Sequence, residues 1–301
     1  MRATNLNTKR TDDRFQNVAV IVNMSAGTAA DISDELKQIL STHEISTPNI
    51  QLVEGPSLPT KLEDIRSDNT DLLIVYGGDG TCKSGAIAAR RANVPLIPLP
   101  GGTMNILPKA LYGTDKWQEA LNLAISETPR WLPCGRINGD AFYVGLFIGE
   151  PIVLADVRES IRDGDILSAT SKLPDVIHAV AHGDTFDYCL DGRIYTGETN
   201  LINITCPNMS HGATAPDAFE FAAVPNLDLA KLFDLGTTAL VEGWRNSDLV
   251  DIRHIQTFTI TGQGVFDVLL DGEPERFPCP ISVHLDTKGV QVLAPEISGN
   301  P

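Results

Sequence analysis

The sequence lacks any apolar run of the roughly 18–20 residues that a membrane-spanning helix requires. Its longest apolar runs, around Val18–Val22 and Leu72–Tyr76, have the length of buried strands. Residues 1–14 lack the apolar segment of a secretory signal, and we expect them to form a flexible tail. These absences predict a cytoplasmic protein.

Cysteine is scarce and unpaired in the sequence. The 301 residues include five cysteines, which are widely separated and never form a CxxC pair. This number and spacing exclude a disulfide framework and a zinc site built on CxxC pairs. The same pattern is typical of proteins in the reducing cytosol.

Basic residues are in deficit, with 23 against 39 acidic residues and a net charge of −16. Residues 1–130 carry 13 basic and 15 acidic residues, whereas residues 131–301 carry 10 and 24. An acidic surface repels phosphate backbones and anionic headgroups. We therefore expect neither a general nucleic-acid partner nor a polybasic membrane anchor.

The length of the chain and the change in its pattern predict two domains. Over residues 15–130, short apolar strands alternate with glycine-containing turns and amphipathic helices, which predicts a parallel sheet covered by helices. Over residues 131–295, short strands and hairpin dipeptides such as Asn138-Gly139 and Asp191-Gly192 predict a mostly antiparallel β domain.

A glycine-rich turn, Gly77-Gly78-Asp79-Gly80-Thr81, directly follows the second buried strand. Glycine lets backbone amides approach a ligand, and the helix that follows directs its first amides and its positive dipole end to the same point. Such a turn can bind phosphate. Asp79 would repel a bare phosphate but suits a Mg²⁺ ion that bridges carboxylate and phosphate oxygens. The alternative is a tight turn in which Asp79 only caps the helix.

A second turn of this kind, Leu99-Pro100-Gly101-Gly102-Thr103-Met104-Asn105, comes one strand–helix unit later. In a parallel sheet both turns lie at the carboxyl ends of strands, where ligands bind. Together the two turns can hold a triphosphate. The sequence contains neither a GxxxxGK[ST] P-loop nor a GxGxxG motif after its first strand.

A third segment, Leu269-Leu270-Asp271-Gly272-Glu273-Pro274, carries two carboxylates in the β domain. If the segment is extended, Asp271 and Glu273 lie on the same face, and Pro274 ends the strand. Paired carboxylates favour protonation of one of them, an arrangement that suits a general base. On the residues alone, an acidic hairpin turn at Asp271-Gly272 is the favoured alternative.

Taken together, these segments resemble the diacylglycerol kinase catalytic-domain family, which includes bacterial lipid kinases and sphingosine kinases. The family's Gly-Gly-Asp-Gly-Thr, Leu-Pro-x-Gly-Thr-x-Asn and Leu-Asp-Gly-Glu-Pro motifs are intact at 77–81, 99–105 and 270–274. Its opening Asn-Pro-x-Ser-Gly loop is similar to Asn23-Met24-Ser25-Ala26-Gly27, with Met24 in place of proline. The resemblance extends from about Asn17 to Pro295.

The resemblance implies an N-terminal α/β domain related to NAD kinase and phosphofructokinase, a C-terminal β-sandwich, and ATP in the cleft between them. It implies an ATP- and Mg²⁺-dependent kinase that transfers the γ-phosphoryl group to the hydroxyl of a lipid such as diacylglycerol, in phospholipid biosynthesis. Glu273 would accept the proton with support from Asp271, and Asp79 would act through Mg²⁺. The implied nucleotide contacts are Asn23, Gly77, Gly78, Asp79, Gly80, Thr81, Cys82, Lys83, Gly102, Thr103 and Asn105.

The chain departs from the family pattern beside two motifs. Cys82-Lys83-Ser84 stands where x-Asn-Glu is usual, and Ile106 replaces an acidic residue. Two other functions stay open. The acidic second half favours transfer to a soluble alcohol, because such a face does not dock readily on anionic bilayers. The replacements at Ser84 and Ile106 favour nucleotide binding without catalysis. A lipid acceptor implies peripheral membrane contact, and the sequence does not indicate an oligomeric state.

Overall fold

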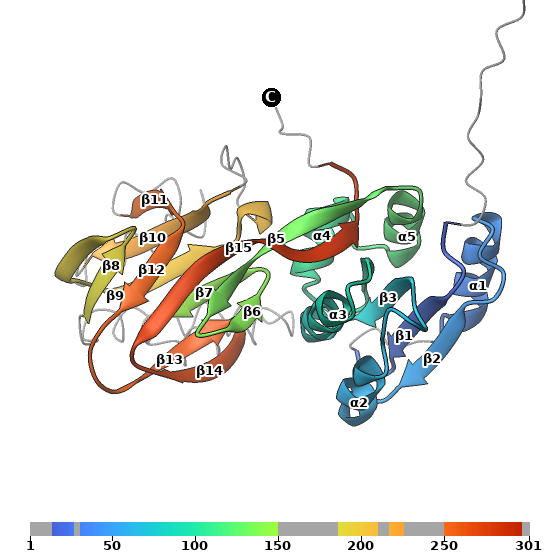
Figure 1. The fold of residues 1–301 in the computed structure, drawn as a ribbon, viewed down its shortest axis with the longest axis horizontal. Coiled ribbons are helices and arrows are strands. Elements are labelled where there is room, and N and C mark those ends of the chain that lie inside the picture. Colours follow the sequence, from blue (N-terminus) through green and yellow to red (C-terminus); the bar gives the residue numbers. More distant parts are fainter. Residues whose placement is uncertain (1–13, 27–30, 150–185, 210–216, 226–249, 297–301) are drawn as a thin grey trace, which may run out of the picture.

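The computed structural model describes residues 14–26, 31–149, 186–209, 217–225 and 250–296. An N-terminal α/β domain precedes a C-terminal antiparallel β domain, so the expected fold class is confirmed (Figure 1). The expected tail over residues 1–14 lies, except for Arg14, outside the described residues. In the described part of the chain, no helix has both the length and the apolar character needed to cross a membrane.

The N-terminal sheet has four parallel strands in the order β2-β1-β3-β4. The strands are β1 (Val18–Asn23), β2 (Asn49–Val53), β3 (Leu72–Gly77) and β4 (Leu96–Pro100). β1 and β3 are apolar along nearly their whole length because helices cover both faces of the sheet. From β1 the chain passes first to β2 and then, in the other direction, to β3 and β4, so the strand order reverses between β1 and β3.

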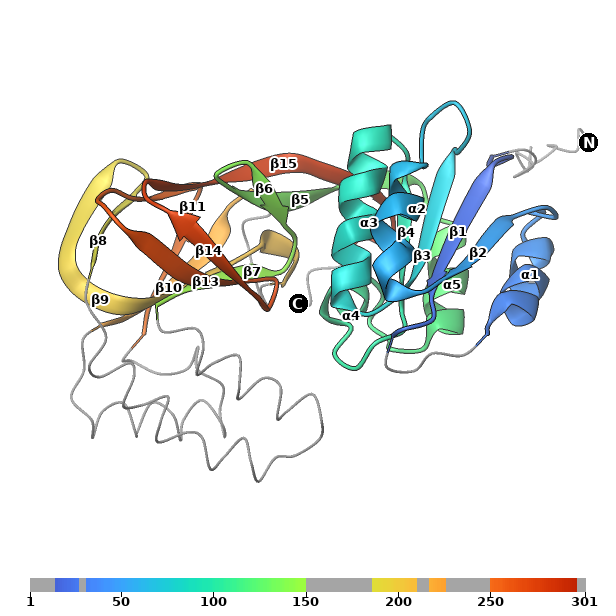
Figure 2. The same cartoon turned by 90° about the horizontal axis from the view of Figure 1, so that it is seen from below.

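Helices pack in two groups on opposite faces of this sheet (Figure 2). α2 and α3 contact each other on one face, and α1 contacts α5 on the other. The helices are α1 (Ser33–Thr42), α2 (Leu58–Glu63), α3 (Asp79–Ala92), α4 (Ile106–Tyr112) and α5 (Trp117–Ile125), with a 3₁₀ turn η1 (Gly55–Ser57). Figure 2 shows α3 on the side of the domain that faces the β domain.

The C-terminal domain is built from antiparallel strand pairs. The predicted hairpin dipeptides Asn138-Gly139 and Asp191-Gly192 connect paired strands and have the positive φ angles that such turns require. The elements are β5 (Pro129–Ile137), β6 (Asp140–Phe142), β7 (Gly145–Ile148), β8 (Phe186–Leu190), β9 (Arg193–Thr205), η2 (Pro207–Met209), β10 (Phe219–Pro225), β11 (Asp251–Ile255), β12 (Thr257–Ile260), β13 (Val265–Leu270), β14 (Glu273–Pro278) and β15 (Ile281–Leu293).

Two long strands join the domains. β15 pairs antiparallel with β5 along most of its length, and its Val292 also pairs with Leu96 of β4. The proposed boundary at residue 130 therefore falls inside β5, and the end of β15 packs in the N-terminal hydrophobic core. The β5–β15 pair is therefore continuous across the junction of the domains. The ranges 15–130 and 131–295 stay a proposal about the limits of the two domains.

Candidate active site

The ends of β1 and β3 meet where the strand order reverses, which is where open α/β sheets bind ligands. Asn23 ends β1, and its Nδ2 donates a hydrogen bond of 2.9 Å to Oγ1 of Thr81 in the first turn of α3. Its Oδ1 accepts a hydrogen bond of 3.0 Å from the amide of Ser25. Asn23 therefore fixes the loop after β1 to the start of α3.

The two glycine-rich turns lie in direct backbone contact. The amide of Gly101 donates to the carbonyl of Gly77 at 2.9 Å. A Cβ on Gly102 would lie 2.5 Å from the Cα of Gly78, closer than any side chain allows. Glycine at this position is what lets the turns meet, so the two turns present one continuous backbone surface at the amino end of α3.

Asp79 is the first residue of α3 and connects the two turns. Its Oδ1 accepts a hydrogen bond of 2.7 Å from the amide of Ile106, the first residue of α4. Gly78 occupies the N-cap position of α3, and no side chain caps that end through a hydrogen bond. Asp79 is therefore not the simple helix cap of the alternative interpretation.

The surroundings of Asp79 fit a Mg²⁺ ion shared with phosphate. Ile106 engages one carboxylate oxygen, and no described residue is recorded as bonded to the other. In nucleotide enzymes, Mg²⁺ is usually held by one or two carboxylates together with phosphate oxygens. In the described ranges no three His, Cys, Asp or Glu side chains gather into a metal site. Among the described residues of the two turns, Asp79 is the carboxylate that could hold the ion, and phosphate oxygens of a nucleotide would complete its coordination.

Asn105 acts within its own turn. Its Oδ1 accepts from the amide of Gly102 at 2.7 Å, and its Nδ2 donates to the carbonyl of the same residue at 2.8 Å. Asn105 is buried with a φ of +52°, a conformation that asparagine tolerates well. The side chain of Asn105 therefore shapes the turn, and its predicted nucleotide contact stays a prediction, while Thr103 is exposed on that turn.

Cys82 lies behind the turns rather than on their surface. Its side chain is fully buried, and its Sγ lies 4.0 Å from the carbonyl oxygens of both Gly77 and Leu99. Burial raises the pKa of this thiol strongly, and the nearby Asp79 carboxylate raises it further, so the thiol stays protonated. The side chain of Cys82 is therefore not exposed to a ligand, and the nucleotide contact expected of this residue stays a prediction.

The third motif forms a hairpin turn, not one extended strand. β13 ends at Leu270, β14 begins at Glu273, and these two residues pair across the turn. Asp271 and Gly272 form the turn with φ angles of +52° and +82°. The segment is therefore not extended, as the shared face of Asp271 and Glu273 would require, and it forms the hairpin turn that the residues alone favour. Pro274 does not end a strand either, since it lies within β14 opposite Leu269.

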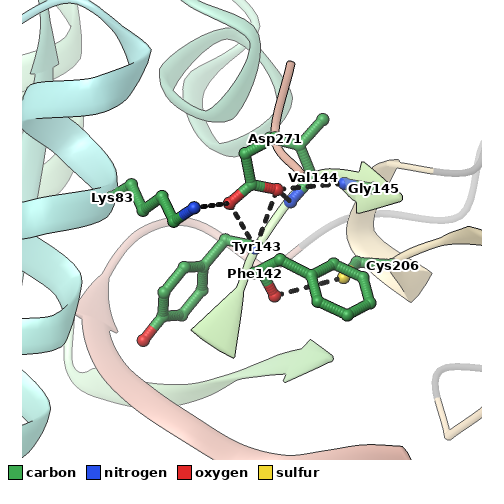
Figure 3. A network of polar contacts seen from close by, with 7 residues as sticks. All are labelled: Lys83, Phe142, Tyr143, Val144, Gly145, Cys206 and Asp271. Atoms are coloured by element: carbon green, nitrogen blue, oxygen red, sulfur yellow. Dashed lines mark hydrogen bonds and ion pairs between the residues drawn. The ribbon is translucent and has the colours of Figure 1, made fainter. Parts of the chain in front are cut away.

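The carboxylate of Asp271 is an anchor for this turn (Figure 3). It is buried and accepts hydrogen bonds of 2.8–3.1 Å from the amides of Tyr143 and Val144, which lie between β6 and β7, and of Gly145, the first residue of β7. Burial raises the pKa of Asp271, while the nearby Lys83 and these amides act against the shift. Glu273, two residues further on, is exposed. Asp271 therefore positions the start of β14.

One ion pair joins this hairpin to the helix of the glycine-rich turns. Nζ of Lys83 on α3 lies 4.0 Å from Oδ2 of Asp271 (Figure 3). Sequence motifs that are about 190 residues apart thereby meet at the junction of the domains. The main-chain partners at residues 143–145 and 106 were not predicted, because a backbone amide that binds a carboxylate leaves no signature in the side-chain sequence.

Gly102→Ala is expected to destabilise the protein by about 1–3 kcal/mol and to weaken nucleotide binding, because the new methyl group forces the two turns apart. Urea denaturation and calorimetric titration with ATP would measure both effects. Gly80→Ala is the control for stability, since a Cβ there meets no atom within 4 Å. Equal stability of the two variants would show that the turns are not closely packed.

Comparison with known proteins places these features in a family context. Residues 17–137 match the model of the diacylglycerol kinase catalytic domain. A Staphylococcus haemolyticus protein described as a "putative lipid kinase" is 25% identical over 252 residues, which are 75% of this chain and 77% of that protein. The NAD kinase of Pseudomonas putida is 28% identical over 99 residues, and the match spans 33% of that enzyme.

The fold is also that of a solved structure. The crystal structure of a "putative diacylglycerol kinase" from Bacillus anthracis superposes with a TM-score of 0.74 and 20% sequence identity. The superposition covers 94% of this chain and 98% of that one. At this identity, the comparison shows a shared fold over both domains.

Proposed function

Because residues 17–137 belong to the diacylglycerol kinase catalytic domain family and the chain is a kinase, we propose that it transfers the γ-phosphoryl group of ATP to the hydroxyl of a diacylglycerol-like lipid. One observation carries this proposal. The paired glycine-rich turns and the Asp271–Glu273 hairpin, from different domains, approach each other through the ion pair of Lys83 and Asp271.

ATP would bind with its phosphates on the two turns. The amides at Gly78 and Gly80, at the amino end of α3, and the exposed Thr103 are suited to phosphate oxygens. Asp79 would hold Mg²⁺ together with the phosphates, and the bound ion would neutralise their negative charge. Asn23 and Thr81, bonded to each other at the end of β1, would support the first turn.

Glu273 would act as the general base toward the acceptor. The acceptor oxygen forms a bond to the γ-phosphorus as the bond from that phosphorus to ADP breaks, and the hydroxyl proton passes to the Glu273 carboxylate. The anchoring of Asp271 on three amides supports this role, since it fixes the point at which β14 begins. An exposed carboxylate beside a fixed turn is accessible to a substrate hydroxyl.

A soluble alcohol is the second candidate acceptor. The strongly acidic composition of residues 131–301 supports it, because net negative charge opposes docking on an anionic membrane. For the lipid acceptor, contact with the bilayer would have to come from an apolar or locally basic part of the surface. The two candidates therefore differ in whether the protein binds vesicles.

Purified protein given ATP, Mg²⁺ and diacylglycerol in mixed vesicles is expected to form phosphatidic acid and to co-sediment with the vesicles. Monoacylglycerol, sphingoid bases, ceramide and glycerol serve as the comparison acceptors in the same assay. Turnover of glycerol without vesicle binding would favour the soluble acceptor. ATP binding without phosphorylation of any of these acceptors would favour a non-catalytic nucleotide-binding protein.

A further inference from the structure

Lys83 lies in the second turn of α3, outside both glycine-rich turns. Resting on the function proposed above, we propose that Lys83 contacts the γ-phosphoryl group of bound ATP and supplies positive charge to it during transfer. The resemblance implies only that residues 77–83 contact the nucleotide as a group. The structure allows this one side chain to be assigned to one phosphate.

The helix geometry places Lys83 between the two halves of the site. Asp79 and Lys83 are four residues apart on α3, so their side chains lie on the same face of the helix, one turn apart. Asp79 bonds to the second turn through Ile106, whereas Lys83 reaches toward Asp271 of the hairpin. A row of charged groups therefore leads from the phosphate turns to the residue that positions Glu273.

Asp271 does not require Lys83 as a hydrogen-bond donor. Its Oδ1 accepts from three amides at 2.8–3.1 Å and its Oδ2 from the amide of Tyr143 at 3.0 Å, whereas Nζ of Lys83 lies 4.0 Å from Oδ2, beyond hydrogen-bonding distance. Within the described ranges, no acceptor lies at hydrogen-bonding distance from this ammonium group. An ammonium group has three donors, so Lys83 can engage phosphate oxygens while it stays close to Asp271.

The environment of Lys83 strengthens its effect. Only 17% of its side chain is exposed, and charge interactions are stronger where water is largely excluded. The site proposed here holds three carboxylates, Asp79, Asp271 and Glu273, before any phosphate enters. The transferred phosphoryl group is negatively charged. A cation at this point offsets the repulsion between this group and the three carboxylates.

The other described basic residues of α3 and α4 have partners elsewhere. Arg90 lies over the ring of Trp131, Arg91 donates to the carbonyl of Leu62, and Lys109 pairs with Asp115. Of the basic residues on these two helices, Lys83 is the one recorded beside the hairpin. Its position on the hairpin side points to the terminal phosphate, because that is the phosphate that must face the acceptor.

The test measures, by calorimetry, the affinity of the protein for two ligands. One is MgADP, and the other is the Mg²⁺ complex of a non-hydrolysable β,γ-imido analogue of ATP. We expect Lys83→Met to weaken binding of the analogue by roughly 10–100-fold, the range for hydrogen bonds to charged groups. ADP affinity should change by less than about twofold, because ADP lacks the phosphate that Lys83 contacts. Lys83→Arg should keep most of the preference for the analogue, since it retains the charge.

Lys116→Met is the matched control, because Lys116 is exposed, lies at the start of α5 and pairs only with Glu119 among the described residues. It should bind both nucleotides like the wild type. If wild-type protein binds the analogue and Lys83→Met retains its preference for it, the assignment of Lys83 is wrong while the proposed function stands. If Lys83→Met weakens both nucleotides equally, Lys83 has only a general electrostatic or structural role. If wild-type protein binds neither nucleotide, the proposed function fails and the assignment fails with it.

Discussion

Glu273→Gln is expected to lower the rate of phosphoryl transfer by about 10²–10⁴-fold, the usual contribution of a positioned general base. Glutamine has nearly the same shape but cannot accept the proton of the acceptor hydroxyl. Glu273 is exposed, and no hydrogen bond of its side chain is recorded among the described residues, so the free energy of unfolding should change little. Affinity for ATP should also persist, because the phosphate turns lie in the other domain.

Initial rates with radiolabelled ATP and diacylglycerol vesicles would measure this loss. Glu275→Gln is the matched control, since Glu275 is an exposed carboxylate on the same strand, two residues further from the anchored turn. It should retain near wild-type activity. Unchanged activity in Glu273→Gln would remove Glu273 from the role of base, and equal losses in both variants would indicate a general effect of charge on the hairpin.

Asp271→Ala is expected to reduce the free energy of unfolding by about 3–5 kcal/mol, the cost of removing one partner from a buried charged network. The substitution leaves three amides without their acceptor and Lys83 without its partner. Alanine also tolerates the positive φ of the turn less well than aspartate does. Phosphoryl transfer should fall with stability, because the start of β14 is no longer fixed.

Urea denaturation of the wild type, Asp271→Ala and Asp271→Asn would separate these causes. Asparagine accepts the turn conformation and keeps one acceptor oxygen but no charge. We therefore expect it to lose less stability than alanine while still losing activity. If Asp271→Ala unfolds at the same urea concentration as the wild type, the carboxylate does not anchor the turn.

The alternation of strands and helices predicted the N-terminal fold well. Runs such as Leu72–Tyr76 are apolar because the sheet is buried on both faces, and glycine turns mark the ends of β3 and β4. The edge strand β2 was not predicted. Its residues Asn49–Val53 are mostly partly or fully exposed and lack a continuous apolar run. Periodicity reports burial, so an exposed edge strand gives a weak signal.

Long-range contacts of the candidate site were harder to predict. The residues alone favoured a hairpin turn at Asp271-Gly272, and this prediction is confirmed. Proximity of the hairpin to α3 follows from the path of β5 and β15, which local patterns do not specify. Asn105 and Cys82 were expected to contact the nucleotide, yet one shapes its turn and the other lies beneath both turns. The motifs therefore predict a region of the molecule but not which of its side chains are exposed there.

A crystal structure of the protein with Mg²⁺ and the β,γ-imido analogue of ATP tests the central claim most directly. The claim is that the two glycine-rich turns and the Asp271–Glu273 hairpin form one phosphoryl-transfer site. We expect the phosphates on the turns at the amino end of α3, the metal ion beside Asp79, and the terminal phosphate toward Lys83 and the hairpin. Phosphates bound away from these turns, or a terminal phosphate facing away from the hairpin, would contradict the claim.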